Sequence, residues 1–392
     1  MSTIADPLVS RRRMAATVSW EKLKELAAFR AVRGRAISLY LDLDPSVAPT
    51  AGDVATHANA LLDEGERTLA AQGELTHDQR AGLRDDFERI RRYVDDEFDR
   101  HGSQGLALFA DGLDNLWQVL PLTEHVPDAV RVAGELHLAP LVPLVGRGEG
   151  ALVAVVSRER GEVYRLRDGK LHEVADEGEE QPGRHDQGGW SQANFQRHID
   201  ELTAEHMRRV AEALNRQVRR LHGPGVVIVC PEPMRTEFEE LLSHETRAAL
   251  AGWTQAEAHA SPAQLLELAV PVLDAWRAQQ EAVALERWRE EAGRNGRAAA
   301  GWERVLEAAS DGRVEVLLYQ EGANRNAYQC PRCGRASTND GSCPLDGTRM
   351  EGRPEGLDLA VHQTLVHGGT VRAVGQRRDL DPVEGIGALL RF

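Results

Sequence analysis

The chain has 392 residues, which favours two or three domains at about 150 residues per domain. Its composition, 42% hydrophobic and 28% charged, is that of an ordinary globular protein and excludes global disorder. The formal net charge of −15 argues against nucleic-acid binding driven by overall charge, so any RNA contact must be local. No apolar run reaches the roughly 18 residues that a membrane span needs, and no apolar segment follows Arg11–Arg13 as in a secretory signal. We therefore expect a cytoplasmic protein with no membrane partner.

The first 130 residues predict an α/β domain. Residues 37–43 alternate apolar and polar side chains and end at Asp44-Pro45, which indicates a half-buried strand followed by a turn. Helical periodicity covers 53–72 and 76–100, and two short strands are expected at 105–109 and 116–120.

A second domain is expected over 131–261. It opens with His137–Pro143 and continues with a strand hairpin over 151–157 and 162–166. Residues 176–193 have no apolar periodicity and predict a long exposed loop. A strong helix follows from about 192 to 222, and the apolar run Val226–Cys230 predicts a buried strand of a parallel or mixed sheet.

The third domain is expected over 262–392. Long helices run to about residue 292, a helix covers 302–309 and a strand covers 314–319. After a cysteine cluster, the segments 361–366, 370–374 and 388–392 complete a small α/β domain. The sequence thus predicts the α/β class with three domains.

Three of the four cysteines lie within fourteen residues, which in a cytoplasmic chain favours metal binding over disulfides. Cys330, Cys333, Cys343 and Asp346 form the pattern C-x2-C-x9-C-x2-D, and a glycine follows each pair. Two such tight turns present four ligands tetrahedrally to a structural zinc ion, so we predict a zinc ribbon over 328–350. A carboxylate is less favoured than a thiolate beside three thiolates. His362 and His367 are alternative fourth ligands. The alternative interpretation of the whole segment is a degenerate ribbon that no longer binds metal.

The second motif is Gly188-Gly189-Trp190-Ser191-Gln192, at the end of the long loop and running into the helix. Adjacent glycines allow a backbone to approach a partner closely, and a helix N-terminus offers N–H donors to a phosphate or an oxyanion. The local pattern alone equally suits a flexible connection. Arginines of this region that could follow an RNA backbone are Arg184, Arg197 and Arg208, although such residues also occur on solvated helices.

The loop and its helix resemble the G-G-Q-S-x-x-R-F segment of the archaeal and eukaryotic class I peptide-chain release factors, and more closely their bacterial relatives. Further similarities follow in the family's order, at 105–109, 137–143, 151–166, 305–319, the cysteine cluster and 385–392. The last of these, G-I-G-A-L-L-R-F, resembles the family's closing G-I-G-G-I-L-R-Y. The resemblance implies that the third domain has the fold of kink-turn-binding ribosomal proteins.

The same resemblance implies binding in the ribosomal A site, with the loop at the peptidyl-transferase centre and residues 188–192 acting on the ester of peptidyl-tRNA. A translational GTPase is a further partner that it implies. Two features depart from the family: Trp190 replaces the motif glutamine, and the first domain has neither N-I-K-S nor Y-x-C-x-x-x-F, the motifs that read stop codons. We therefore expect release or rescue of peptidyl-tRNA without codon reading. The alternative is a non-catalytic rescue or hibernation factor of the Pelota or Balon kind.

Overall fold

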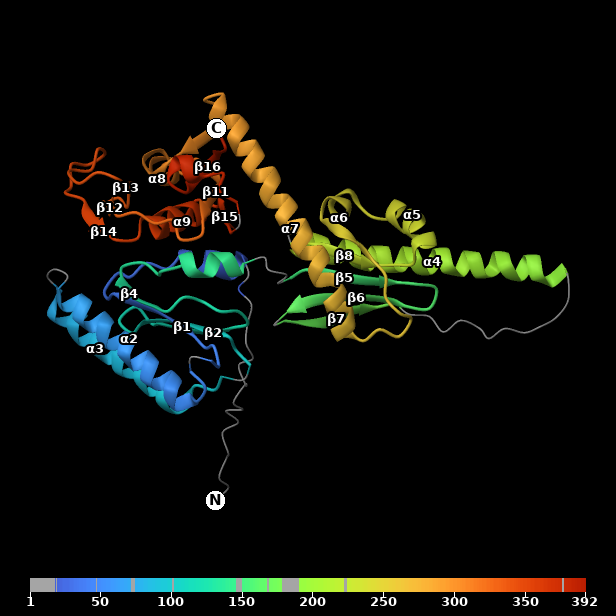
Figure 1. Ribbon diagram of the computed structural model, residues 1–392, viewed down its shortest axis with the longest axis horizontal. Helices are drawn as coiled ribbons and strands as arrows, with labels where there is room; N and C mark the ends of the chain where they lie inside the picture. Colours follow the sequence, from blue (N-terminus) through green and yellow to red (C-terminus); the bar gives the residue numbers. More distant parts are fainter. Residues whose placement is uncertain are drawn as a thin grey trace, which may run out of the picture. The chain divides into compact units, whose positions relative to one another are not determined.

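The computed structural model describes residues 18, 20–46, 48–71, 75–100, 102–145, 150–167, 169–177, 190–221, 224–375 and 377–392 (Figure 1). For residues 70, 71 and 190–200 only the backbone is described. The chain forms two compact units that meet in the sequence at Leu144 and Val145. The class is α/β, with several separate sheets.

The first unit is built on an antiparallel sheet of strand order β3-β2-β1-β4 (Figure 1). Its strands are β1 (Ala36–Asp42), β2 (Gly105–Asp111), β3 (Leu116–Leu122) and β4 (Ala129–Ala133). Its helices are α1 (Trp20–Ala27), α2 (Ala51–Ala71) and α3 (His77–Arg92), which the π-helical turn η1 (Tyr93–Glu97) extends. Alternate residues of β1, such as Leu39 and Leu41, pack with α2 and α3 in one core. The period-2 and helical patterns of the sequence predicted β1, β2, β3, α2 and α3, whereas α1 and β4 were not predicted.

The strand β4 and the segment after it belong to the first sheet. Val132 of β4 pairs with Ile37 of β1, so the predicted domain boundary at residue 130 falls inside a strand. The 3-10 helix η2 (Ala139–Leu144) follows, and the His137 N–H just before it donates to Ser38 Oγ at 3.0 Å. The segment 137–143, expected to open the second domain, is therefore hydrogen-bonded to the first sheet. The division into three domains stays a prediction.

A mixed sheet of order β7-β6-β5-β8-β9 begins the second unit. Its strands are β5 (Leu152–Val156), β6 (Gly161–Arg167), β7 (Lys170–Asp176), β8 (Val226–Val229) and β9 (Leu250–Thr254). The first three are antiparallel, as in the predicted hairpin, whereas β5, β8 and β9 run parallel. Helices α4 (Trp190–Leu221) and α5 (Glu232–Glu240) contribute to the core on one face, and α7 (Pro262–Gly293) contributes to the core on the other. The short helix α6 (His244–Ala248) is attached to α4 by a hydrogen bond from Thr246 Oγ1 to Asn215 Oδ1, at 2.6 Å. The buried strand predicted at Val226–Cys230 is confirmed.

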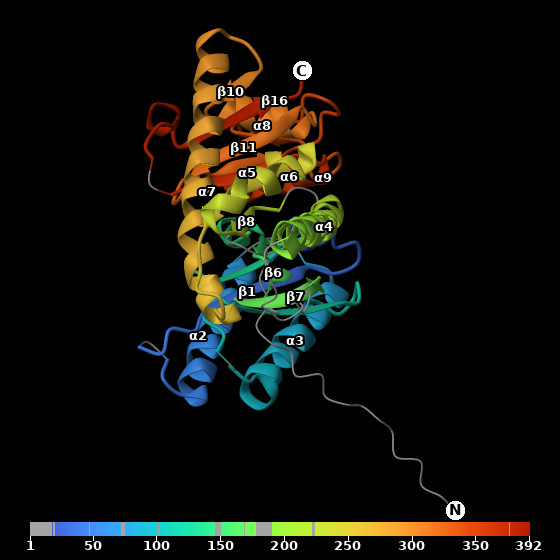
Figure 2. The same cartoon turned by 90° about the vertical axis from the view of Figure 1, so that its right-hand side faces the viewer.

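The last sheet has the order β10-β16-β11-β15. Its strands are β10 (Ala298–Ala300), β11 (Val314–Gln320), β15 (Thr370–Val374) and β16 (Ile386–Leu390), with helices α8 (Trp302–Ser310) and α9 (Gly356–Val366) and the 3-10 turn η3 (Asp381–Val383). The long helix α7 contributes to two cores (Figure 2): Leu265 and Leu273 pack on β5 and β8, while Leu285 and Trp288 pack on β11 and β16.

None of the helices in the described ranges is both long enough and apolar enough to cross a membrane.

Candidate functional site

Two turns of the same backbone design hold the cysteine cluster. In each turn the N–H of the first cysteine donates to the carbonyl five residues later, at 2.9 Å for Cys330 and 2.7 Å for Cys343. The glycine four residues after that cysteine donates back to its carbonyl at 2.9 Å, in both turns. Gly334 and Gly347 have φ of 79° and 74°, a conformation that glycine adopts without strain. By this repeat, Asp346 stands in the second turn where Cys333 stands in the first.

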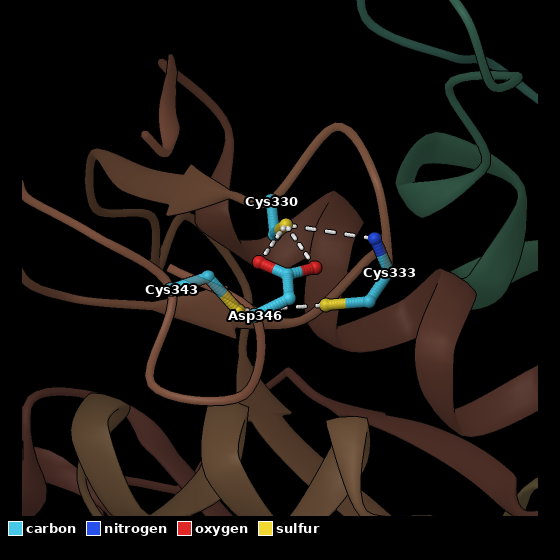
Figure 3. Close-up of side chains that lie close together, drawn as sticks. All are labelled: Cys330, Cys333, Cys343 and Asp346. Carbon is cyan, nitrogen blue, oxygen red and sulfur yellow. Dashed lines mark hydrogen bonds between the residues drawn. The ribbon is translucent and has the colours of Figure 1, made fainter. Parts of the chain in front are cut away.

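The four side chains converge on one point (Figure 3). Their ligand atoms all lie within 4.8 Å of one another. Cys330 Sγ is 3.5 and 3.6 Å from the two oxygens of Asp346, and the Sγ atoms of Cys333 and Cys343 are 3.5 Å apart without a disulfide bond. Tetrahedral zinc, with bonds of about 2.3 Å to sulfur and about 2.0 Å to oxygen, separates such atoms by about 3.5 to 3.8 Å. The four residues therefore form a candidate metal site.

A local hydrogen bond favours the ionised form of the Asp346 carboxyl, which is the form that binds a cation. The Thr348 N–H donates to Asp346 Oδ1 at 2.9 Å and lowers the pKa of this carboxyl to about 2. The Arg335 N–H lowers the pKa of Cys333, but loss of solvation of the sulfur and hydrogen bonds with the other two thiols outweigh it and raise that pKa to about 11. Adjacent thiols resist ionising together, and a bound cation removes this penalty.

The two histidines considered as fourth ligands lie outside this group. Among the residues that the structure describes, the metal-capable cluster contains Asp346 and neither His362 nor His367. His362 is 6% exposed on α9, and His367 Nδ1 donates to Gln363 O at 2.9 Å. The geometry therefore favours the carboxylate as the fourth ligand.

A small antiparallel sheet carries the two turns and attaches them to helices α8 and α9. It consists of β12 (Ala327–Gln329), β13 (Ala336–Ser337) and β14 (Glu351–Arg353) in the order β13-β12-β14. Arg335 bonds to Asp311 Oδ1 at 2.6 Å, and Gln363 Nε2 donates to Gly334 O at 3.0 Å. The first of the two turns is thus fixed to the C-terminal end of α8 and to α9.

The Gly-Gly-Trp motif lies at the boundary of the described chain. Gly188, Gly189 and Arg184 lie outside it, and the helix α4 begins at Trp190. The side chains of Trp190, Ser191, Gln192 and Arg197 are likewise outside the description, so their spatial relation stays a prediction. Arg208 is exposed on α4.

Comparison with known proteins identifies the relatives of this chain. Residues 137–273 match the family model described as bacterial archaeo-eukaryotic release factor family 10. The resemblance to the release factors is confirmed. Peptide chain release factor subunit 1 of Archaeoglobus fulgidus is 25% identical over 333 residues, which cover 80% of this chain and 78% of that protein. The same factor of Thermococcus kodakarensis is 25% identical over 334 residues, with the same coverage.

Solved structures show a looser likeness. Dom34 of S. cerevisiae, described as a translation termination-like factor, has a TM-score of 0.41 at 11% identity, covering 74% of this chain and 79% of that chain. The archaeal termination factor aRF1 has a TM-score of 0.26 at 16% identity, covering 96% and 99%. The matched family region, 137–273, contains both the Gly-Gly-Trp motif and α4.

Proposed function

We propose that this protein is a ribosome-binding translation factor of the release-factor type, acting in the A site on peptidyl-tRNA. The observation that carries the proposal is the similarity to peptide chain release factors over four fifths of the chain. The family match over residues 137–273, which includes the motif, supports the central part as the functional one. A ribosomal target also accommodates the net charge of −15, because contacts at a few exposed arginines such as Arg208 would then supply the RNA binding.

The proposed reaction is hydrolysis of the ester that links the peptide to tRNA. Water attacks the ester carbonyl, and a preorganised donor to the developing oxyanion is worth about 10² to 10³ in rate. A backbone N–H at residue 189 or 190 supplies such a donor whatever the side chain is. Trp190 removes the amide that would orient the water, and Gln187 or Gln192 is the nearest substitute. Because the stop-codon motifs are missing, we propose that the substrate is peptidyl-tRNA on a ribosome with an empty A site, released without codon reading.

Trp190 also favours a second candidate, a non-catalytic rescue or hibernation factor. An indole stacks on a nucleobase with about 1 to 3 kcal/mol per base, so Trp190 is suited to binding ribosomal RNA. It is poorly suited to orienting a water molecule. In that case a translational GTPase or another factor would complete the rescue.

Release of labelled peptide from ribosomes with an empty A site, measured beside ribosome binding, distinguishes the two. For a hydrolase, Trp190→Gln preserves or raises the rate, and Gly189→Pro abolishes it because proline removes the donor. For a binding factor, Trp190→Ala weakens ribosome binding by about 1 to 3 kcal/mol and changes no release rate. If the wild type binds ribosomes tightly but peptide release stays at the spontaneous rate, the hydrolase proposal is wrong. Absence of both activities sinks the proposed function altogether.

We also propose that Cys330, Cys333, Cys343 and Asp346 hold one structural zinc ion. The matched turns and the spacing of the ligand atoms support this set. Bound zinc would neutralise the adjacent thiolates and fix the two turns to each other. The sequence around the two turns shows no water-activating base, so the ion has a structural part in the proposal.

Metal analysis of chelator-free protein tests the zinc proposal, with about one equivalent expected for a four-ligand structural site. Asp346→Ala lowers the zinc content and Asp346→Cys preserves it against stronger chelation, because a fourth thiolate is the favoured ligand. Asp340→Ala is the matched control, an exposed carboxylate in the same ribbon that lies outside the cluster. Equal zinc retention in Asp346→Ala and Asp340→Ala would show that the carboxylate is no ligand.

A further inference from the structure

One turn of the central sheet is hydrogen-bonded to the chain both before and after the Gly-Gly-Trp motif in the sequence. Glu177, the last described residue after β7, donates its N–H to Gly161 O at 2.7 Å. On the return path, His206 of α4 donates from Nε2 to Arg160 O at 3.1 Å. Arg160 ends the β5–β6 turn and Gly161 begins β6, so the last described residue before the motif and a residue of α4 after it are hydrogen-bonded to neighbouring residues of one hairpin.

The contact between this turn and α4 is close and buried. His206 is 1% exposed, although it is a polar residue in a long helix with exposed arginines. A Cβ on Gly161 would lie 2.5 Å from His206 Cε1 and 2.6 Å from Val210 Cγ2, so only glycine allows the helix to approach this far. The Arg160 carbonyl also accepts from the Ser157 N–H at 2.9 Å. Both lone pairs of that oxygen are therefore used.

The side chain of Arg160 fixes the turn from its other side. Its Nε donates to both oxygens of Glu162, at 2.9 and 3.1 Å. Its Nη1 donates to the carbonyls of Ala258 and Ala260, at 3.1 and 3.2 Å, just before Ser261 caps α7. The Arg160 side chain is only 20% exposed. The turn thus joins α4 to the segment that leads into α7.

We propose that the Ser157–Gly161 turn sets the direction of α4 and so the position of its first residue, Trp190, and that His206 is a positioning residue for the activity proposed above. From His206 to Trp190 the helix spans 16 residues, or about 24 Å at 1.5 Å per residue. A tilt of about 5° at the turn therefore displaces Trp190 by about 2 Å. Since a misplacement of about 1 Å can cost about 10²-fold in rate, a tilt of this size is large enough to change the rate of the proposed reaction. The inference rests on the proposed function.

Three variants test the anchor in the full-length protein. His206→Leu keeps the apolar bulk and removes the donor, His206→Gln keeps a donor, and Gly161→Ala pushes the helix away. His172→Gln, at an exposed position on β7, is the matched control. Hydrogen exchange at Glu177 and along residues 201–210 is measured in the free protein, and kcat and KM for peptide release are measured on ribosomes with an empty A site.

In His206→Leu and Gly161→Ala we expect exchange to accelerate roughly tenfold at these amides and kcat to fall at least about tenfold with little change in KM. His206→Gln should restore both, and His172→Gln should change neither. Wild-type exchange in His206→Leu overturns the anchor, and faster exchange with an unchanged kcat overturns its positioning role. If the wild type releases no peptide, the hydrolase proposal fails on that result, while the exchange comparison still decides whether the turn holds α4.

Discussion

Gly387, in the closing segment that resembles the release-factor motif, is a position where we expect a single added methyl group to be costly. A Cβ there would lie 2.6 Å from Trp288 Nε1 and 2.7 Å from its Cε2. The indole is 5% exposed, and its Nε1 donates to Ala299 O at 2.9 Å. It therefore cannot move aside without losing that bond.

The expected loss of stability in Gly387→Ala combines two destabilising effects with one stabilising effect. Overpacking of a filled core costs about 1 to 3 kcal/mol, and loss of the indole hydrogen bond costs about 1 kcal/mol more. The smaller entropy of the unfolded alanine chain returns about 0.4 to 1 kcal/mol. Gly387→Ala should therefore destabilise the β10-β16-β11-β15 sheet by about 1 to 3 kcal/mol.

Native-state hydrogen exchange at β16 is the appropriate assay, because a chain with two compact units need not unfold in one step. Gly293→Ala is the control: it adds the same methyl at the end of α7, where nothing lies within 4 Å. Replacing Trp288 by phenylalanine should relieve part of the cost in the double variant. Equal exchange in Gly387→Ala and Gly293→Ala would refute the argument that the indole requires this glycine.

Two predictions concern pH. Burial raises the pKa of Asp111 to about 6, so ionisation of this carboxyl increasingly destabilises the folded state as pH rises from about 4 to above 6. Asp111→Asn should therefore stabilise the first unit by about 1 to 3 kcal/mol at pH 7, with no gain below pH 4. A denaturation series across this range that shows the same difference at every pH would contradict it. The hydrogen bond to Asp42 raises the pKa of His125, so this exposed pair contributes stability below about pH 6.5 that is lost as pH rises through the folded-state value. His125→Ala should therefore lower the melting temperature slightly at pH 6 and leave it unchanged at pH 9; an equal loss at both would exclude the charged pair as its cause.

Strong periodicity in the sequence predicted most elements, because long apolar faces must be buried whatever the partner. The strands that it missed are short or polar. In β7 only Leu171 is buried, so its side chains carry almost no period-2 pattern, and its pairing with β6 is a main-chain property. In β10, three alanines pair with β16. The strand β4 was also not predictable from local sequence, because its place beside β1 depends on pairing with residues almost one hundred positions away.

The cysteine cluster was predictable for the opposite reason. Each turn is local, and its spacing alone places two ligands on one side of a tight backbone loop. The sequence left Asp346, His362 and His367 as competing fourth ligands. The structure favours Asp346, because the hydrogen-bond pattern of the first turn is repeated in the second.

The glycines of this chain carry information that a turn pattern does not reveal. Gly161 and Gly387 lie in strands and are absent from the residues with positive φ, so neither is needed for a turn. Instead, each glycine leaves room for a buried ring that packs directly against its backbone, His206 against Gly161 and Trp288 against Gly387. In the sequence these rings are 45 and 99 positions away from their glycines, so no local pattern could pair them. Close approach of a helix to a sheet thus explains the glycine within the closing motif. The same physical reason explains Gly161, which lies against α4, the helix that follows the Gly-Gly-Trp motif in the sequence.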